Sequence, residues 1–262
     1  MNSTMTPSEK ISAAIAAAPA GTAIVAFITA GYPSRERFRE HLAQIGKAAD
    51  VIEIGVPFTD PMADGVTIQR SSREALAQGF TLRWLLDELA AMRREGSLPA
   101  APLILMSYLN PLLAFGFKQL AADAAQSGVC GFIVPDLPFD EADDLRAALD
   151  PSGLALVQMV TPVTQPARMA RLCAASQGFV YAVTMTGTTG KNASVPGDVA
   201  RYLDGVRAVA KLPVCAGFGI RSREQVEQLK GHVAGVIVGS ALVEVLESGG
   251  NPAQFLNSLR PS

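Results

Sequence analysis

The sequence predicts an α/β fold, a closed (β/α)8 barrel preceded by one extra N-terminal helix. Eight short apolar segments alternate with longer amphipathic segments, and most are apolar at every position. Continuous apolarity is typical of parallel strands that are covered on both faces, whereas a strand with one exposed face alternates apolar and polar residues. The length of 262 residues also suits such a barrel, which usually needs about 250 residues. We therefore expect a single domain over residues 1–262.

The strand count favours this TIM barrel architecture over an open sheet. A doubly wound sheet usually needs fewer strands, and a dinucleotide-binding sheet would carry G-x-G-x-x-G in its first turn. The first turn here, residues 29–33, reads TAGYP. A short helix at 8–17 is expected to close the bottom of the barrel. Strands are expected at 23–30, 51–55, 103–106, 131–134, 154–160, 179–183, 214–217 and 235–238, and further helices at 82–94, 117–126, 141–149, 167–174, 199–210 and 223–230.

The overall composition limits the function classes. The chain is 49% hydrophobic and 18% charged with a formal net charge of −2, so nothing suggests nucleic acid or an anionic membrane as a partner. The N-terminus lacks a signal-peptide pattern, and no apolar stretch reaches the roughly 18 residues of a membrane span, so a cytoplasmic protein is expected. Cys130, Cys173 and Cys215 are far apart and are expected to be buried thiols outside any disulfide or zinc site.

One carboxylate falls inside an apolar strand. Glu53 lies within residues 51–55, VIEIG, and strand alternation places it on the same face as Val51 and Gly55, which we assign to the barrel interior. A carboxylate there is costly unless it is paired or used, and burial would raise its pKa toward neutrality. Glu53 is therefore a candidate general acid/base. The alternative is a structural carboxylate held by an arginine or by backbone donors.

The loop after this strand carries two further carboxylates. Residues 56–65 read VPFTDPMADG and include Asp60 and Asp64. Asp64 precedes an expected helix that begins near residues 65–68, so it could cap that helix, and Asp60 could form a turn before Pro61. Residue types and spacing leave each aspartate open between turn formation and function.

Two glycine-bearing turns indicate a phosphate site. The seventh strand ends in GFGI, residues 217–220, and the eighth ends in VGSA, residues 238–241, which opens a short helix. Backbone N–H groups at such turns can converge on an anion, and barrels of this kind bind phosphate after strands seven and eight. The alternative is that these glycines serve only tight turns.

The segment after the sixth strand is expected to act as a lid. Residues 185–197, MTGTTGKNASVPG, are small and polar, which fits a mobile cover that excludes water, with a surface loop as the alternative. No cluster has metal-ligand spacing, no lysine ends a strand, and His41 and His232 lie away from strand ends. The chemistry is therefore expected to be acid–base catalysis without a metal or a covalent cofactor.

Several segments together resemble the tryptophan synthase alpha chain family. The most specific is IEIGVPFTDPMADG at residues 52–65, followed by TIQ at 67–69. The resemblance covers essentially the whole chain. It continues in FITAGYP at 27–33, MSYLNP at 106–111, VPDLP at 134–138, GTTG at 187–190 and GFGI at 217–220.

The resemblance implies a lyase that splits indole-3-glycerol phosphate into indole and glyceraldehyde 3-phosphate. Glu53 matches the acid/base that protonates C3 of the indole ring and takes the proton of the side-chain hydroxyl. Asp64 matches the carboxylate that holds the indole N–H. Tyr181, at the end of the sixth strand, matches a tyrosine beside the glutamate, although an ordinary core tyrosine is the alternative.

The resemblance also implies the residues that bind the substrate. Phe27 and Phe218 would sandwich the indole, although barrel filling would explain them equally well. Thr189 matches a lid residue that contacts Asp64. The phosphate cradle is matched by Gly190, Gly219, Gly239 and Ser240.

A partner chain is a further implication of the resemblance. A pyridoxal-phosphate-dependent beta chain would receive the indole in an α2β2 assembly, while this chain carries no cofactor. Two positions depart from the family pattern, since Met185 stands where many members have arginine and Val66 replaces a proline; both bear on lid motion and on coupling to the partner. The expected contact surface includes Asp60, Asn110, Pro111 and Asp136 in loops around the barrel mouth.

Three other functions stay open at this point. Another phosphate-binding barrel enzyme would need a catalytic lysine or histidine at a strand end, which the sequence lacks. A catalytically silent barrel that binds phosphate and only regulates the beta chain would not need both Glu53 and Asp64. A stand-alone lyase that releases free indole would use the same residues, so only turnover without a partner separates it.

Overall fold

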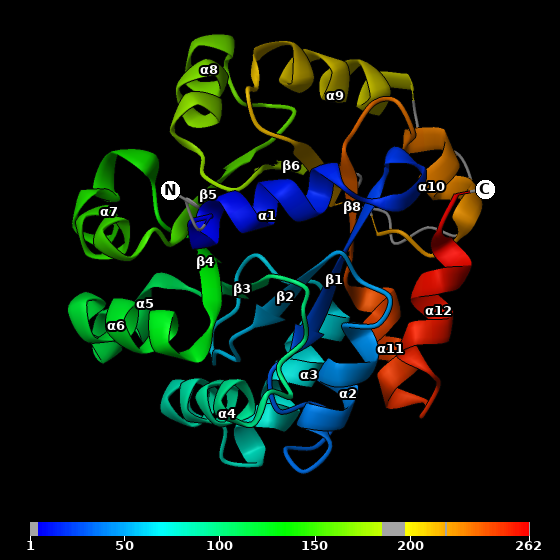
Figure 1. Cartoon of the computed structure of the whole chain (residues 1–262). Helices are drawn as coiled ribbons and strands as arrows, with labels where there is room; N and C mark the ends of the chain where they lie inside the picture. Colours follow the sequence, from blue (N-terminus) through cyan, green and yellow to red (C-terminus); the bar gives the residue numbers. More distant parts are fainter. Residues whose placement is uncertain (1–4, 185–196, 218, 262) are drawn as a thin grey trace.

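The computed structural model, which describes residues 5–184, 197–217 and 219–261, contains a closed barrel of eight parallel strands. The strands follow one another in sequence order, and β8 pairs with β1 to close the barrel (Figure 1). The predicted barrel is confirmed, with every predicted strand present and no end moved by more than two residues. The strands are β1 (Ala23–Thr29), β2 (Val51–Gly55), β3 (Leu103–Met106), β4 (Val129–Ile133), β5 (Ala155–Val160), β6 (Val180–Val183), β7 (Val214–Gly217) and β8 (Gly235–Val238).

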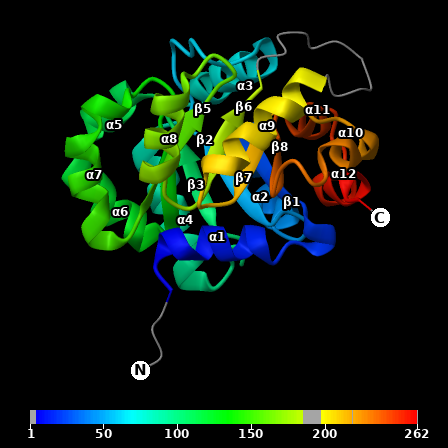
Figure 2. The same ribbon diagram turned by 90° about the horizontal axis from the view of Figure 1, so that it is seen from above.

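Helices surround the barrel, and the predicted N-terminal helix lies across its bottom. α1 (Pro7–Ala16) runs beneath the strands (Figure 2), where the buried side chains of Ile11 and Ile15 join the interior cluster. A capping box between Thr6 and Glu9 begins this helix. The other α-helices are α2 (Phe38–Ile45), α3 (Val66–Ala77), α4 (Leu82–Glu95), α5 (Leu109–Phe115), α6 (Phe117–Ser127), α7 (Asp143–Leu149), α8 (Pro166–Ala175), α9 (Gly197–Val209), α10 (Arg223–Leu229), α11 (Ser240–Glu247) and α12 (Pro252–Leu259), with 3-10 turns η1 (Pro19–Gly21), η2 (Phe139–Glu141) and η3 (Asp150–Ser152).

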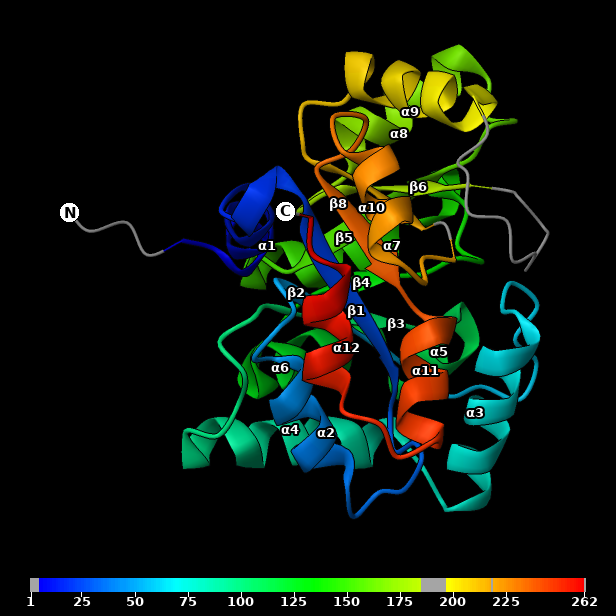
Figure 3. The same ribbon diagram turned by 90° about the vertical axis from the view of Figure 1, so that its right-hand side faces the viewer.

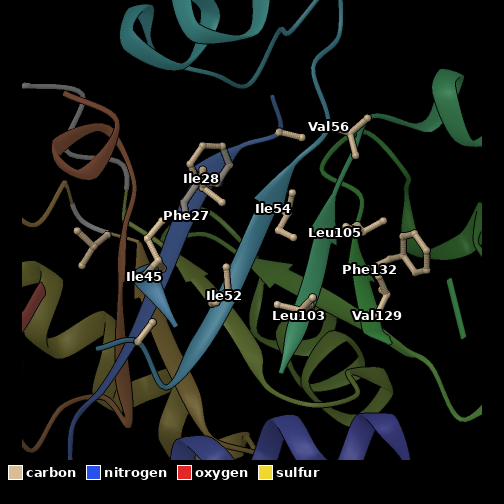
Figure 4. Close-up of a cluster of buried hydrophobic side chains, with 14 of the residues drawn as sticks. Phe27, Ile28, Ile45, Ile52, Ile54, Val56, Leu103, Leu105, Val129 and Phe132 are labelled. Atoms are coloured by element: carbon tan, nitrogen blue, oxygen red, sulfur yellow. The ribbon is translucent and has the colours of Figure 1, made fainter. Parts of the chain in front are cut away.

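Two apolar layers explain why the strands are apolar at every position. Val25, Val51 and Ile104 point into the barrel, where they join the cluster that α1 closes from below. Their strand neighbours, such as Ile52 and Leu103, point outward to the helices (Figure 4). Burial of an aliphatic side chain of this size stabilises the fold by roughly 1.5–3 kcal/mol, so both faces of each strand contribute.

The strand register puts the glutamate of β2 in the inward row. Glu53 pairs with Phe27 of β1 and with Ile104 of β3, two residues beyond Val51 toward the C-terminal end of the strand. Barrels of this kind carry their active sites at the C-terminal ends of the strands. Among the helices of the described residues, none is both long enough and apolar enough to cross a membrane.

Candidate active site

Glu53 lies in the barrel interior without a hydrogen-bonding partner among the described residues. Its side chain is 1% exposed, and its Oε2 atom is fully buried. Burial, and secondarily the negative charge of Asp64, raise the pKa of Glu53 to about 8. The carboxyl group is therefore mostly protonated at neutral pH, as a proton donor requires. No arginine or backbone donor of the described residues holds it, so the structural alternative finds no support there.

Asp64 lies half-buried in the loop between β2 and α3. Burial raises the pKa of Asp64 to about 6, and a hydrogen bond with Tyr108 opposes the rise. The alternative in which Asp64 caps the next helix is wrong, because Gly65 is the N-cap of α3 and no side chain caps it. Gln69 of α3 instead donates a hydrogen bond to the backbone oxygen of Asp64 at 2.8 Å. Two neighbouring carboxyl groups with separated pKa values suit an acid and a base.

Tyr108 is a site residue that the sequence analysis missed. Its side chain is buried, and its hydroxyl accepts a hydrogen bond from the backbone N–H of Ala63 at 2.8 Å while it also bonds Asp64. Its ring packs on Phe58 with the centroids 5.3 Å apart. Burial raises the pKa of Tyr108 to about 12, so the hydroxyl is neutral and can donate to a carboxylate. A polar aromatic residue just beyond a strand end was the signal that could have found it.

Two glycines let aromatic side chains lie close to the barrel wall. A Cβ atom at Gly217 would lie 2.8 Å from the hydroxyl oxygen of Tyr181, and one at Gly55 would overlap the ring of Phe27. Burial, followed by the charges of Glu53 and Asp64, raises the pKa of Tyr181 well above its ordinary value. The hydroxyl of Tyr181 is thus neutral beside the two carboxyl groups.

The turns after β7 and β8 have backbone shapes that suit an anion. Gly219 has a φ angle of 68°, a left-handed conformation that glycine adopts without a steric cost. Gly239 is the N-cap of α11, and Ser240 is its first residue. The first N–H groups of a helix have no acceptor within it and can bind an anion. The phosphate site at these two turns stays a prediction.

Part of the predicted site lies outside the described residues. This holds for Thr189, Gly190 and Phe218, and for the predicted lid at 185–197 with the exception of its last residue. That residue, Gly197, begins α9 and belongs to a helix.

Three of the four predicted partner contacts line one depression at the barrel mouth. Asp60, Asn110 and Asp136 surround a cavity of about 300 Å³, and Pro111 follows within α5. Asp136 accepts a hydrogen bond from the backbone N–H of Leu109 at 2.8 Å, which joins the loops after β3 and β4. Asp60 and Asp136 lie in the loops after β2 and β4, and Asn110 lies in the first turn of α5, so the barrel brings together residues from three separate segments.

The cysteines and the candidate metal ligands add no further site. All three cysteines are free and buried, as expected. Within the part of the chain that the structure describes, no group of three histidine, cysteine, aspartate or glutamate side chains could hold a metal ion. His232, to which no role was assigned, pairs with Asp204 at 2.8 Å.

Comparisons with known sequences identify relatives of this chain. The family model described as tryptophan synthase alpha chain matches residues 14–260. A tryptophan synthase alpha chain from Nitratidesulfovibrio vulgaris is 45% identical over 237 residues, which make up 90% of this chain and 91% of the relative. The chain of the same name from Desulfovibrio desulfuricans is 44% identical over 251 residues, or 95% and 96% of the two chains.

Solved structures agree with the sequence comparisons. Tryptophan synthase from M. tuberculosis, in an aminoacrylate-bound form, contains a chain that superimposes with a TM-score of 0.84 at 32% identity, covering 95% of this chain and 97% of that one. A tryptophan synthase complex from Pyrococcus furiosus gives 0.81 at 32% identity, covering 90% and 97%. Because the family model spans nearly the whole chain and relatives are more than 40% identical to it, the chain belongs to the tryptophan synthase alpha chain family and is a carbon–carbon lyase of tryptophan biosynthesis.

Proposed function

We propose that Glu53 and Asp64 divide the acid–base work of this lyase, the retro-aldol cleavage of indole-3-glycerol phosphate into indole and glyceraldehyde 3-phosphate. The observation that carries the proposal is the buried Glu53 carboxyl group, whose pKa of about 8 keeps it protonated at neutral pH. Asp64, with a pKa of about 6, is largely ionised under the same conditions. One group can therefore give a proton while its neighbour holds a negative charge.

The reaction breaks the bond between C3 of the indole ring and the glycerol phosphate side chain. Indole is a poor leaving group until C3 is protonated, so Glu53 first donates its proton to C3. The positive charge that develops on the ring nitrogen is stabilised by ionised Asp64, which accepts a hydrogen bond from the ring N–H. Glu53, now a carboxylate, takes the proton of the neighbouring side-chain hydroxyl, the carbon–carbon bond electrons return to the ring, and the hydroxyl carbon becomes the aldehyde.

The surrounding residues support these two roles. The hydrogen bond from Tyr108 opposes the rise in the pKa of Asp64 and so keeps it ionised. The space beside Glu53 is bordered by the neutral hydroxyl of Tyr181 and the ring of Phe27. The phosphate group is assigned to the turns at Gly219 and Gly239–Ser240. The contributions of Thr189, Gly190 and Phe218 stay predictions.

The barrel mouth is the proposed docking surface for a beta chain in an α2β2 assembly, which would receive the indole. Met62, which lines the Asp60–Asn110–Asp136 depression, is 83% exposed, and Val66, the first residue of α3, is 74% exposed. A depression that combines apolar side chains such as Phe58, Met62 and Leu109 with the polar Asp60, Asn110 and Asp136 suits a protein interface. Pyridoxal phosphate belongs to the beta chain, and chains of this family carry no cofactor. The same proposal treats residues 1–262 as a single domain of a cytoplasmic enzyme.

The test is the release of indole from indole-3-glycerol phosphate by the purified chain, alone and with a cognate beta chain. We expect slow release by the chain alone and a strong rise on adding the beta chain. Glu53→Gln and Asp64→Asn should each lower kcat by about 100-fold or more, whereas Glu95→Gln, a change at an exposed carboxylate, should not. Fast release without the beta chain would indicate a stand-alone lyase. No release in either case would indicate a silent phosphate-binding barrel.

A further inference from the structure

An ion-pair network connects three segments of the site that are far apart in the sequence. Arg221, in the loop after β7, donates two hydrogen bonds to Glu244 of α11, from Nη1 to Oε2 at 2.7 Å and from Nη2 to Oε1 at 2.9 Å. Thr67 of α3 reaches the same carboxylate at 3.4 Å. Arg70 of α3 pairs with Glu247 of α11 at 2.6 Å. Figure 3 shows α3 and α11 side by side, as these contacts require.

The two ends of the Arg221–Glu244 pair each adjoin one phosphate-binding turn. Arg221 follows Gly219 by two residues, and the buried Ile220 anchors the chain between them. Glu244 follows Ser240 by four residues, so the two side chains lie on the same face of α11, one turn apart. The pair therefore spans from the turn after β7 to the helix that begins at the turn after β8.

Arg221 is itself held firmly at its backbone. Its N–H donates to Oε1 of Gln225 at 2.7 Å, and Gln225 also forms the capping box that begins α10. Because the backbone of Arg221 is already fixed, less conformational freedom is lost when its side chain binds Glu244. The pair can therefore hold the two turns at a fixed separation.

We propose that Arg221 and Glu244 are positioning residues, whose two-bonded pair holds the turn after β7 and the start of α11 at the separation that the substrate phosphate group needs. This inference rests on the proposed assignment of the phosphate group to those turns. Neither side chain is a catalytic residue, and neither has to touch the substrate.

Two observations favour this role over a purely stabilising pair or a direct phosphate ligand. The side chains are 50% and 39% exposed, and pairs this exposed contribute little to global stability. Both terminal nitrogens of the Arg221 guanidinium already donate to Glu244, so the planar group faces the helix. Arg221 also neutralises a carboxylate that would otherwise stand one helical turn from a phosphate dianion, and the pair lowers the pKa of Glu244, which keeps it ionised.

The experiment is a steady-state comparison of Arg221→Ala, Glu244→Ala, the double variant and the exchanged pair Arg221→Glu/Glu244→Arg, each assembled with the beta chain. Each single change should raise both the KM for indole-3-glycerol phosphate and the inhibition constant of inorganic phosphate by about three- to fivefold, with kcat within about twofold. In the double variant, the KM and the phosphate inhibition constant should rise no further than in either single variant, because the pair acts as a unit. In the exchanged pair, the KM and the phosphate inhibition constant should return most of the way to the wild-type values.

Glu95→Ala is the matched control. Glu95 pairs with Arg39 at the same 2.7 Å, and the side chain of Glu95 is 52% exposed and that of Arg39 is 39% exposed. It ends α4, which leads to the N-terminal end of β3 and so lies at the opposite end of the barrel from the phosphate turns. Its loss should leave KM and the phosphate inhibition constant unchanged.

The outcomes separate this inference from the phosphate assignment on which it rests. Ser240→Asp places a carboxylate in the cradle and should nearly abolish competition by inorganic phosphate. If Ser240→Asp acts in this way but Arg221→Ala leaves KM unchanged, the positioning role is refuted and the cradle stands. A KM that falls in Glu244→Ala would mean that the freed Arg221 binds phosphate directly, which also refutes it. If inorganic phosphate does not compete with substrate in the wild type, the cradle itself is wrong.

Discussion

Replacement of Glu53 by glutamine is predicted to stabilise the fold while it removes the acid/base. Glu53 is 1% exposed, has no hydrogen-bonding partner among the described residues, and has a pKa of about 8 instead of the ordinary 4.5. Glutamine has nearly the same shape and cannot ionise. The variant therefore avoids the free-energy cost of a buried carboxylate.

The gain in the free energy of unfolding of Glu53→Gln over the wild type depends on pH, and proton linkage determines the direction of this dependence. Between pH 4.5 and 8 the unfolded chain has released the Glu53 proton while the folded chain retains it. The stability of the wild type therefore falls as the pH rises through this window and is constant above it. At about 1.36 kcal/mol per pKa unit, the full difference is about 5 kcal/mol, of which about 3 kcal/mol is present at pH 7.

Urea denaturation of the wild type and of Glu53→Gln at about pH 5, 7 and 9 measures this difference. The variant should gain less than about 1 kcal/mol near pH 5 and progressively more at the two higher values. Glu95→Gln, at an exposed carboxylate, should show no such trend. If Glu53→Gln is no more stable than the wild type near pH 9, the carboxyl group is not the buried, unpaired acid described above, and the reasoning fails.

Three further predictions concern activity. The pH profile of kcat/KM should be bell-shaped, with limbs near the pKa values of about 6 for Asp64, which must be ionised, and about 8 for Glu53, which must be protonated; a profile flat across this range would contradict both roles. Tyr108→Phe removes a hydrogen bond that lowers the pKa of Asp64, so the acid limb of the same profile should move to higher pH, and an unmoved limb would argue against the contact. Gly217→Ala places a methyl group 2.8 Å from the Tyr181 hydroxyl; indole release should fall by about tenfold and stability by about 1–3 kcal/mol, and wild-type rates would disprove the close approach.

The barrel was predictable because its signal is local and repeated. Most strand positions are apolar on both faces, since one face meets the interior cluster and the other meets the helices, so most strands can be recognised from their own residues alone. Short helices carried a weaker signal. The (β/α)8 pattern implied a helix after every strand, but no residue range was predicted for α2, α5 or α12, and the helix predicted at 141–149 begins two residues later, after the 3-10 turn η2. Segments of seven or eight residues present too few turns for a clear helical period.

The sequence by itself determined the barrel and the inward position of Glu53, because strand alternation needs only the neighbours in the chain. It left Asp64 open between a helix cap and a functional carboxylate, and it did not single out Tyr108. Only the tertiary structure decided those points, because Tyr108 and Asp64 meet across two different loops. The pKa values of the two carboxyl groups were decided in the same way, since desolvation and charge proximity arise from segments that become neighbours only when the barrel closes.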